Sequence, residues 1–403
     1  MTSLASTGPV PYKALGDLAT IFGGLTGKSK ADFADGNARY VSYTNIFNNP
    51  ASRIDAADFV HVGPTERQRP LRQGDILFTG SSETRSEVAT SSVITSEVTE
   101  PLYLNSFSIA CRPAGGLLVP EFSKHLFRSR ALRQQLVGTA SGVTRFNVSK
   151  ARLARVRIPL PPLEMQRRVA EVLDSFTQLE AELEAELEAR RRQYAHHRDT
   201  MVLDSAVQVP LHELGKFSRG RRFTKADVVE TGIPSIHYGE IYTDYGVAAQ
   251  STTSHVRSEL RPSLRYANTN DVIIAGVGET VEDVGKAVAW LGVEPVAYHD
   301  DCFAFTHDLN PKFVAYAMQT EDFHRQKDKY VSRAKVKRLS ADGLGKILIP
   351  APPRDEQDRI VDVLDSFDAL VNDLSVGLPA ELAARRKQYE YYRDKLLTFP
   401  EAS

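Results

Sequence analysis

The chain has very little cysteine, with only Cys111 and Cys302 in 403 residues. Neither belongs to a Cys-x-x-Cys pair, and both lie in hydrophobic runs typical of strands. A disulfide framework and a cysteine-ligated zinc site are therefore excluded. We expect two buried thiols in a reducing compartment, which favours a cytoplasmic protein.

Long hydrophobic runs are also missing. No apolar stretch approaches the length of about 18 residues that a membrane span needs, and residues 1–12 lack the basic start and apolar core of a signal peptide. The chain is 42% hydrophobic and 25% charged, as ordinary globular proteins are. We predict two or three folded domains with no membrane contact.

No catalytic constellation is present either. The run 23–29 resembles a phosphate-binding loop, but that motif needs a glycine where this chain has Phe22. We find neither an Asn/Asp-Pro-Pro-aromatic motif for base methylation nor an acid-x-Lys pair for nucleolysis, and the ten histidines show no metal spacing. We predict a chain with no catalysis of its own, no metal and no directly bound cofactor. An enzyme with unrecognised motifs is the weakest alternative.

The formal net charge of −1 hides a partition. Residues 160–203 hold nine acids and six bases, and residues 351–398 hold ten acids and seven bases, so each segment carries −3. Removing this −6 from the total of −1 leaves +5 for the rest of the chain. The remaining parts are therefore basic enough to face phosphate, although the charge alone does not identify a nucleic-acid binder.

An internal repeat dominates the sequence. Residues 158–176 match residues 349–367 at 11 of 19 positions. A second block, 189–199, recurs as 384–394. The first pair of blocks is separated by 191 positions and the second pair by 195, so the second copy is four residues longer between its blocks. Such a repeat predicts a duplicated architecture.

Each repeat predicts a long helix. A Pro-Pro pair precedes each one at a position where helices begin, and apolar residues then follow at spacings of three and four, which is typical of a coiled-coil seam. We predict a helix over 163–203 and a second one broken near 377–379, where Gly-Leu-Pro interrupts it. Acids early and bases late in the first helix favour antiparallel pairing of the two.

The segments before each helix read as diverged copies of one mixed α/β domain. The run 75–80 corresponds to 271–276, and each reads as a buried strand that ends in a glycine loop. We divide the chain into a first α/β domain (1–157), a first helix (158–204), a second α/β domain (205–348) and a second helix (349–403). The prediction is a pseudo-twofold arrangement of two similar domains joined by an antiparallel coiled coil. Scaffold positions agree between the copies, whereas exposed polar positions differ.

With these residues in view, the chain resembles the specificity subunits of type I restriction-modification systems. The resemblance covers nearly the whole chain. Its carriers are 158–162 leading to Gln166, 173–176, 191–194, and 142–145 with Ser149 and Lys150. The runs 28–33 and 43–47 resemble one subtype of recognition domain.

The resemblance implies that each α/β domain is a target-recognition domain reading one half of a bipartite, asymmetric double-stranded DNA target. It also implies that the helices set the gap between half-sites and dock two methyltransferase subunits, which bring S-adenosylmethionine and, through them, restriction subunits. The alternative is a coiled-coil interaction scaffold with no DNA role. Retention on duplex DNA that is lost as salt rises separates the two.

Two sets of candidate residues follow from the resemblance and from the polar loops. The DNA-contacting candidates are Lys28, Lys30, Tyr43, Asn45, Ser81, Ser82, Arg85, Thr144, Arg145, Arg219, Arg221, Arg222, Lys225, His237, Tyr238, Arg333, Lys335 and Lys337. The partner-contacting candidates are Gln166, Leu173, Phe176, Arg190, Arg191, Tyr194, Gln357, Leu364, Phe367, Arg385, Arg386 and Tyr389. Because 332–336 replaces the Gly-x-Thr-Arg pattern in the second domain, the role of Arg145 is not transferred there.

Overall fold

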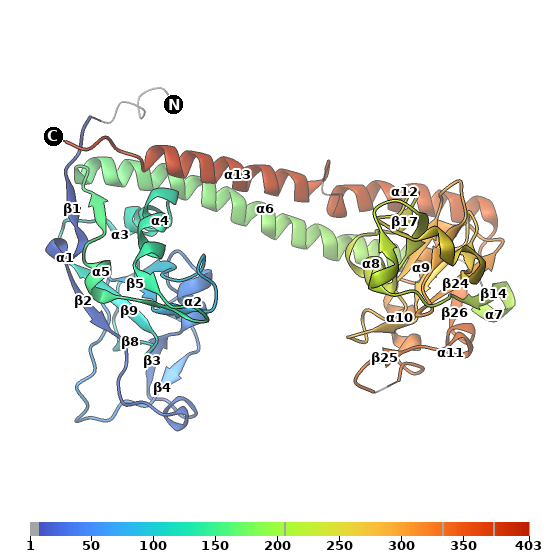
Figure 1. Ribbon diagram of the computed structural model, residues 1–403, viewed down its shortest axis with the longest axis horizontal. Coiled ribbons are helices and arrows are strands. Elements are labelled where there is room, and N and C mark those ends of the chain that lie inside the picture. The colour runs from blue at the N-terminus through green and yellow to red at the C-terminus, as the bar shows by residue number, and fades with distance from the viewer. Residues whose placement is uncertain (1–7, 205–206, 333, 374, 403) are drawn as a thin grey trace. The chain divides into compact units, whose positions relative to one another are not determined.

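The computed structural model describes residues 8–204, 207–332, 334–373 and 375–402. The chain forms two compact units, Met1–Leu183 with Leu382–Ser403, and Glu184–Glu381. Each unit contains one mixed α/β domain together with parts of the long helices, which confirms the predicted fold class (Figure 1). The division between the units therefore falls within the long helices.

A four-stranded antiparallel sheet forms the centre of the first unit, in the order β2-β9-β5-β7. Its strands are β2 (Ala19–Gly23), β9 (Ser108–Pro113), β5 (Ile76–Thr79) and β7 (Ser91–Val93). β5 is buried along its whole length. Successive side chains of a strand point to opposite faces, so Phe78 enters one hydrophobic cluster and Leu77 another.

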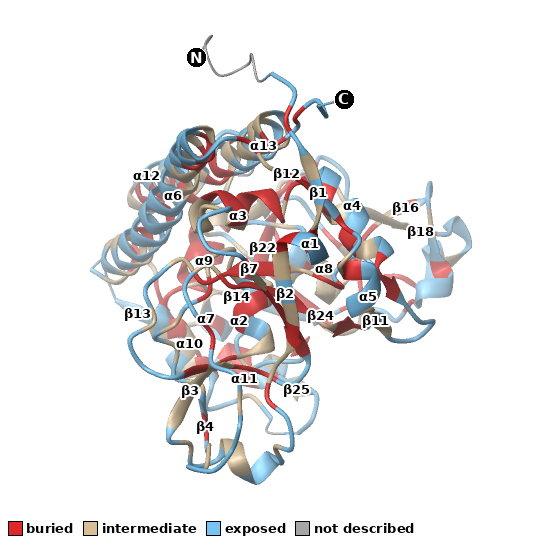
Figure 2. Ribbon diagram, turned by 90° about the vertical axis from the view of Figure 1, so that its left-hand side faces the viewer, coloured by how far each residue is buried: buried red, intermediate tan, exposed pale blue. Residues whose placement is uncertain are grey.

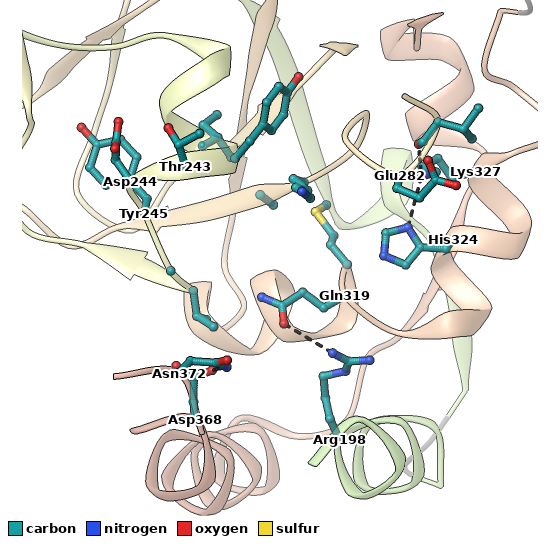
Figure 3. Close-up of a pocket in the computed structure, with 18 of the residues that line it drawn as sticks. Arg198, Thr243, Asp244, Tyr245, Glu282, Gln319, His324, Lys327, Asp368 and Asn372 are labelled. Atoms are coloured by element: carbon teal, nitrogen blue, oxygen red, sulfur yellow. Dashed lines mark hydrogen bonds between the residues drawn. The ribbon is translucent and has the colours of Figure 1, made fainter. Parts of the chain in front are cut away.

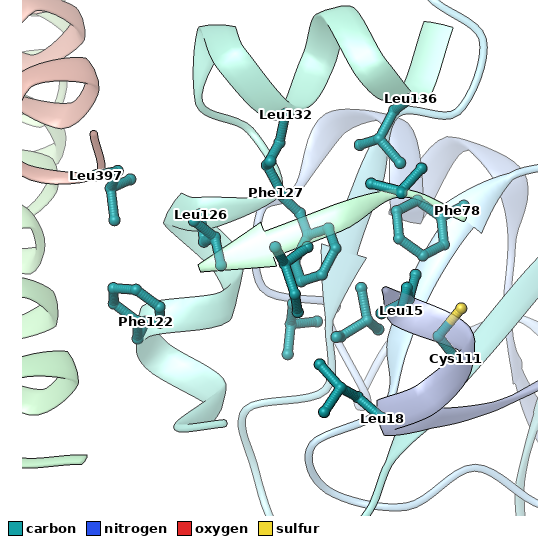
Figure 4. Packing of buried hydrophobic residues seen from close by; sticks show 14 of the residues in the cluster. Leu15, Leu18, Phe78, Cys111, Phe122, Leu126, Phe127, Leu132, Leu136 and Leu397 are labelled. Carbon is teal, nitrogen blue, oxygen red and sulfur yellow. The ribbon is translucent and has the colours of Figure 1, made fainter. Parts of the chain in front are cut away.

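Helices cover one face of this sheet. They are α3 (Pro120–Leu126) and α4 (Arg130–Gly138), whose buried side chains surround Phe78 (Figure 4). The rings of Phe78 and Phe127 lie 5.6 Å apart, edge to face. Cys111 is fully buried in the same cluster, as predicted, and burial raises the pKa of its thiol.

Smaller elements complete the first unit. The strand sets are β4 (Phe59–Val60), β3 (Ala38–Val41) and β8 (Leu102–Leu104); β10 (Ala140–Ser141), β11 (Phe146–Val148) and β6 (Ser81–Ser82); and β1 (Tyr12–Ala14) with β12 (Arg157–Pro159). The short helices are α1 (Leu15–Leu18), η1 (Lys30–Phe33), α2 (Tyr43–Asn48) and α5 (Lys150–Leu153).

The second unit repeats this plan with longer sheets. One sheet has the order β14-β24-β20-β22-β17 and the other has the order β15-β18-β16-β23-β19. The strands are β14 (Gly215–Arg219), β24 (Cys302–His307), β20 (Val272–Ala275), β22 (Ala287–Trp290), β17 (Ala248–Ala249), β15 (Val228–Val229), β18 (Ser254–Val256), β16 (Ile233–Ile236), β23 (Val296–Tyr298) and β19 (Tyr266–Ala267). Two further pairs are β13 (Gln208–Pro210) with β26 (Leu348–Pro350) and β21 (Val277–Gly278) with β25 (Lys337–Arg338). Cys302 is fully buried here, also as predicted.

Apart from η3, the short helices of the second unit correspond in order to those of the first. They are α7 (Leu211–Leu214), η2 (Lys225–Asp227), α8 (Tyr238–Thr243), η3 (Ser258–Ser263), α9 (Pro311–Ala317), α10 (Glu321–Lys327) and α11 (Ala341–Gly345). The pair α9 and α10 follows β24 as α3 and α4 follow β9.

The long helices begin and end where the sequence predicts. α6 runs unbroken over Leu163–Leu203, and the second helix is divided into α12 (Arg354–Asn372) and α13 (Leu378–Leu396). At the division, a Cβ on Gly377 would lie 2.5 Å from the carbonyl oxygens of Ala369 and Leu370. Only glycine tolerates such a close approach of backbone, so the break depends on this residue.

Pairing of the helices is antiparallel within each unit. In the first unit, Glu180 of α6 accepts a hydrogen bond from Arg386 of α13 at 2.7 Å, and Phe176 stacks on Tyr392 at 5.4 Å. In the second unit the ring of His197, in α6, lies 5.8 Å from that of Phe367, in α12. Within the described part of the chain, no helix combines the length and apolar character needed to cross a bilayer.

Candidate nucleic-acid interface

A tight turn between β8 and β9 lies at one edge of the central sheet in the first unit. Two glycines flank it: the N–H of Gly80 donates to the carbonyl of Phe107 at 2.9 Å, and the N–H of Gly24 donates to that of Ser108 at 3.3 Å. A Cβ on Gly24 would lie 2.0 Å from the carbonyl oxygen of Asn105. The turn is therefore held between two segments that must approach it without side chains.

The second unit has the same turn between β23 and β24. Gly276 donates to the carbonyl of Asp301 at 2.8 Å, and Gly220 donates to that of Cys302 at 3.1 Å. A Cβ on Gly220 would lie 2.1 Å from the carbonyl oxygen of His299. The backbone frame is thus the same in both units, although its members are far apart in the sequence.

A buried polar side chain fixes each turn from inside. In the first unit the Oδ1 atom of Asn105 accepts the N–H of Phe107 at 3.0 Å. In the second, the Nδ1 atom of His299 accepts the N–H of Asp301 at 3.1 Å, while its Nε2 atom lies 3.0 Å from the carbonyl oxygen of Phe223. His299, Asp300 and Asp301 lie close enough to share a metal ion. Both ring nitrogens of His299 are already engaged by backbone, so we assign no metal there.

Several predicted DNA contacts converge beside the first turn. The strand β6, which contains Ser81 and Ser82, pairs with β11. Arg145, exposed just before β11, donates from Nη2 to the Oγ atom of Ser81 at 3.1 Å, and the Tyr43 hydroxyl donates to the Ser81 carbonyl at 3.0 Å. Tyr43, Ser81 and Arg145 thus share one edge of the domain.

Strand pairing shows how the second unit departs from the first. Asn147 lies opposite Ser81 in the first unit, and Arg338 lies opposite Val277 in the second. The position of Arg145 is therefore occupied by Val336, and the basic residues Lys337 and Arg338 follow it. Arg338 reaches the turn, because its Nη1 atom lies 3.2 Å from Oδ1 of Asp301.

Aromatic rings pack behind the turn of the second unit. The ring of His237 lies 4.4 Å from that of His299 and 4.3 Å from that of Tyr238. Burial, followed by the neighbouring His299, lowers the pKa of His237 to about 4. His237 is therefore neutral at neutral pH and contributes shape and hydrogen bonding to this edge, with no positive charge.

Two more DNA-contacting candidates, Lys28 and Asn45, make contacts that hold loops within the domain. Lys28 lies 2.5 Å from Glu66, donates to the carbonyl of His61 at 2.6 Å, and leaves 3% of its side chain exposed. This interaction with Lys28 is the main reason that the pKa of Glu66 is lowered to about 2. Asn45 is buried, and its side chain binds the backbone of Arg53 twice: Oδ1 accepts the N–H of Arg53, and Nδ2 donates to the carbonyl of Arg53. We assign both residues to loop stability.

The other DNA-contacting candidates lie on the surface or outside the described residues. Exposed on the protein surface are Lys30, Arg85, Thr144, Arg219, Arg221, Arg222, Lys225 and Lys335, whereas Lys337 is half-buried. Arg219 lies at the second turn and donates from Nε to the carbonyl of Asp300 at 2.6 Å. Arg333 lies outside the residues that the structure describes.

The repeated residues of the long helices have a role that the sequence did not reveal. Gln166 accepts the N–H of Val119, at the start of α3, at 2.8 Å. Gln357 accepts the N–H of Asn310, at the start of α9, at 2.7 Å. Each glutamine also donates to a carbonyl of the proline pair before its own helix, at 2.9 Å and 2.7 Å. The repeat therefore fastens an α/β domain to a helix within each unit.

Two repeated aspartates extend this attachment. Asp174 lies 2.6 Å from His125 and 2.7 Å from Lys124, both on α3. Asp365 accepts hydrogen bonds from Tyr316 at 2.7 Å and Lys312 at 2.6 Å, both on α9.

The second repeated block attaches the next helix. Asp394 accepts the N–H of Arg130, the first residue of α4, at 3.0 Å. Asp199 accepts the N–H of Glu321, the first residue of α10, at 2.8 Å. A carboxylate at a helix N-terminus satisfies a free N–H and favours the helix dipole.

These contacts change the assignment of the partner-contacting candidates. The buried residues Gln166, Leu173, Tyr194, Gln357 and Leu364 are at most 5% exposed, so they do not offer a surface to a partner, and we assign them to the internal attachment. The half-buried Phe176, Phe367 and Tyr389 make the aromatic and hydrogen-bond contacts of the helices within their units. Arg190, Arg191 and Arg386 are exposed, and Arg385 is half-buried.

A pocket of about 770 Å³ in the second unit lies between α8, α10 and the long helices (Figure 3). Lys327, whose side chain is 1% exposed, donates to the carbonyl of Val281 at 2.7 Å and lies 3.1 Å from Nδ1 of His324. The three cations of the pocket have acidic neighbours, as Arg198 with Asp199, Lys286 with Asp283 and Lys327 with Asp328. We therefore assign no charged ligand to this pocket.

Comparison with known proteins finds the same family twice along the chain. The family model described as "Type I restriction modification DNA specificity domain" matches residues 9–189 and again residues 205–384. The chain belongs to this family of DNA specificity domains.

Individual relatives agree. A putative type I restriction enzyme specificity subunit of Haemophilus influenzae is 28% identical over 274 residues, which cover 64% of this chain and 68% of that protein. The EcoR124I/EcoR124II specificity subunit of Escherichia coli is 29% identical over 257 residues, 61% of this chain and 63% of its own length. A solved chain from a study of complex assembly and conformational transition of the type I R-M system has the same fold, with a TM-score of 0.67 at 18% identity over 97% of this chain and 98% of that one.

Proposed function

We propose that this chain is the DNA-reading subunit of a type I restriction-modification complex, and that each α/β domain reads one half of a bipartite, asymmetric double-stranded target. The observation that carries the proposal is the pair of equivalent turns, in which one backbone frame presents different side chains. Equal frames place two domains on DNA in the same way, and different side chains read different bases.

Methylation mapping tests this proposal. Host DNA from strains with and without the gene should differ at one two-part sequence. Exchanging residues 209–348 for those of another family member should change one half of that sequence and leave the other intact. If both halves change, the two domains do not read DNA independently.

The proposal includes no catalysis by the chain itself. S-adenosylmethionine is expected on the methyltransferase partner, and methyl transfer and cleavage belong to partner subunits. Purified chain with S-adenosylmethionine and duplex should transfer no methyl groups. Transfer by the chain alone would show that it is an enzyme, whereas duplex binding that is insensitive to salt or absent would favour the scaffold alternative.

A repeated and exposed stripe on the helices supports partner docking. Most identical residues of the repeat are used in the internal attachment, but one set faces solvent. We name this set the helix stripe; it comprises Arg168, Val172, Ser175 and Leu179 on α6, and Arg359, Val363, Ser366 and Leu370 on α12, all of them exposed except the half-buried Val172. Spacings of four, three and four place each set on one helix face, and exposed faces of these helices are pale blue in Figure 2.

The apolar members make the stripe unusual. Leu179 is 45% exposed, Leu370 is 42% exposed and Val363 is 40% exposed. Packing within the chain does not explain why the same leucine is repeated and exposed in both copies. Contact with an external partner would explain it. Two copies of one surface correspond to two partner subunits, so we propose that one methyltransferase subunit docks on each copy of the helix stripe and that restriction subunits join through them.

Charge placed on the stripe tests this assignment. Leu179→Glu should remove one methyltransferase subunit from the co-purified complex, Leu370→Glu should remove the other, and the double variant should leave the chain alone. Gln178→Glu is the matched control, because this exposed neighbour of Leu179 differs between the copies. Native mass spectrometry counts the subunits. An intact 2:1 complex in the double variant would rule out the stripe as the docking surface.

A further inference from the structure

We propose that the two equivalent turns are the base-reading positions of the two domains, with Phe107 reading in the first and Asp300 and Asp301 in the second. The inference rests on the proposed function and names the side chains that give each half-site its sequence. It concerns residues that the sequence did not single out.

The turns combine a fixed backbone with divergent tips. Both are held by two flanking glycines and by one buried polar side chain, with hydrogen bonds of 2.8 to 3.3 Å. The tips nevertheless differ in chemistry, since 105–107 reads Asn-Ser-Phe and 299–301 reads His-Asp-Asp. A frame that keeps its position while its side chains change is suited to reading different bases at the same depth.

Phe107 needs an external partner. It is 64% exposed, which leaves a large apolar ring in water. Its carbonyl oxygen accepts from Gly80, and the next residue, Ser81, is held by Arg145 and Tyr43. The segment that pairs with the Phe107 backbone thus also holds Arg145, a cation suited to phosphate. DNA offers the exposed ring apolar contact through thymine methyl groups or between base steps.

The acidic tip of the second unit has the opposite chemistry. Asp301 lies 3.2 Å from Nη1 of Arg338, and Asp300 lies 3.7 Å from Nη2 of Arg219. Both arginines remain about half exposed, at 56% and 55% of their side chains. These four residues line an open pocket of about 480 Å³ together with Tyr330 and Ser332.

The neighbouring arginines, Arg219 and Arg338, allow the two aspartates to approach negatively charged DNA. The arginines offset the repulsion between the carboxylates and phosphate, and they orient the carboxylate oxygens. A carboxylate only accepts hydrogen bonds, so it selects a base that presents an exocyclic amino group, above all cytosine N4 in the major groove. We therefore assign apolar reading to the first domain and amino-group reading to the second.

Single substitutions in the full complex test the assignment. Phe107→Ala should relax one position of the first half-site, and Phe107→Leu should relax it less. Asp300→Asn and Asp301→Asn each replace one of the two acceptor oxygens with a donor NH2 group, and each should relax or change one position of the second half-site only. The expected loss is roughly 5- to 150-fold in discrimination against the wrong base, the range for one good base contact.

Matched controls separate reading from general damage. Leu117→Ala removes an apolar side chain that is 40% exposed elsewhere in the first domain. Asp308→Asn neutralises an exposed acid outside the turn of the second domain, where Asp300 and Asp301 are half-buried. Both control complexes should keep the parental target. Discrimination is measured as binding of the assembled complex to duplexes that each change one base pair, and methylation mapping reads the same positions in cells.

The outcomes distinguish this inference from the proposed function. If the parental complex shows no two-part target, the proposed function fails. If the parental complex reads such a target and all turn variants read it with unchanged discrimination, only this inference is overturned. A variant that assembles but no longer methylates is decided by the duplex panel, where equal loss for every duplex overturns the inference and loss of discrimination at one position supports it.

Discussion

His125 and Asp174 lie 2.6 Å apart, from Nε2 to Oδ1, where α3 meets α6. The Nδ1 atom of His125 lies 2.9 Å from the Tyr389 hydroxyl on α13. Burial lowers the pKa of His125 although Asp174 opposes the shift. A neutral imidazole donates through one nitrogen and accepts through the other, which fits this pair of contacts. One side chain thus joins an α/β domain to two helices of its unit.

His125→Phe should weaken this attachment. It leaves the hydroxyl of the half-buried Tyr389 without its acceptor and Asp174 with Lys124 alone, a loss of about 1 to 3 kcal/mol. Hydrogen exchange of α3 measures the local opening free energy. In a cycle with Tyr389→Phe, the two losses should not add, because the residues share one hydrogen bond. Additive losses would mean that the contact carries no energy.

Asp394→Ala should loosen α4 more than Asp199→Ala loosens α10. The side chain of Ser129 makes no cap bond at the start of α4, whereas that of Thr320 accepts from Phe323 at the start of α10. Asp394 is therefore the main carboxylate at its helix N-terminus, and its loss should cost about 0.5 to 2 kcal/mol.

Asp394→Asn is the matched variant, because the amide keeps an acceptor oxygen. Hydrogen exchange at the first turn of α4 and of α10 reads both effects. Equal protection in Asp394→Ala and the parental chain would show that the aspartate does not hold the helix.

The second unit should lose stability in mild acid. Burial is the main cause that lowers the pKa values of His237, His307 and His324 to about 4. Because these values lie below the ordinary value of about 6.5, their contribution is complete above that pH and is lost as pH falls towards 4. In this range the unfolded chain binds more protons than the folded one, so the free energy of unfolding falls with pH. The fall is at most about 1.4 kcal/mol per pH unit for each histidine, and less where solvent screens the charge.

The only tryptophan of the chain makes this measurable. Trp290 is buried in the second unit at 3% exposure, so its fluorescence follows the unfolding of that unit. The urea midpoint should fall between pH 7.5 and pH 4.5, and less steeply in a variant with all three histidines replaced by glutamine. A urea midpoint that does not change with pH would show that these histidines have ordinary pKa values in the folded unit.

Local patterns in the sequence predicted the helices because the signals lie close together. The proline pairs, the heptad spacing and the Gly377 break are each contained within a few turns. Repetition alone, however, did not distinguish an internal contact from an external one, so Gln166 was assigned to a partner although it binds Val119. The ion pair between Lys28 and Glu66 could not be predicted from the sequence either, because the two residues are 38 positions apart and meet only in the folded chain.

The turns were missed for a related physical reason. Phe107 is positioned by Gly24, which follows β2, and by Gly80, which follows β5, so its exposure depends on how those strands pair with β9. A lone phenylalanine in a sequence is normally assigned to a core. Comparison of the two units shows that Asp301 occupies the position of Phe107, so this position of the turn accepts unlike side chains.

The length of α6 should set the gap between the half-sites. α6 is a continuous helix from Leu163 to Leu203, and the two compact units divide at residues 183 and 184. An insertion after Leu183 therefore falls at the boundary between the two units. The second connection does not fix a length in the same way, because α12 ends at Asn372 and α13 begins at Leu378.

Inserting Glu-Ala-Glu-Leu after Leu183 should widen the target gap and preserve both half-sites. Four residues advance a helix by about 6 Å and rotate it by only about 40°, so the apolar seam keeps its face. At about 3.4 Å per base pair, the gap should grow by about one to two base pairs. Inserting only Glu-Ala rotates the helix by about 200° and should impair assembly, because the seam then faces solvent. Methylation mapping of both strains decides the matter, since an unchanged gap with the longer insertion would mean that another element sets the spacing.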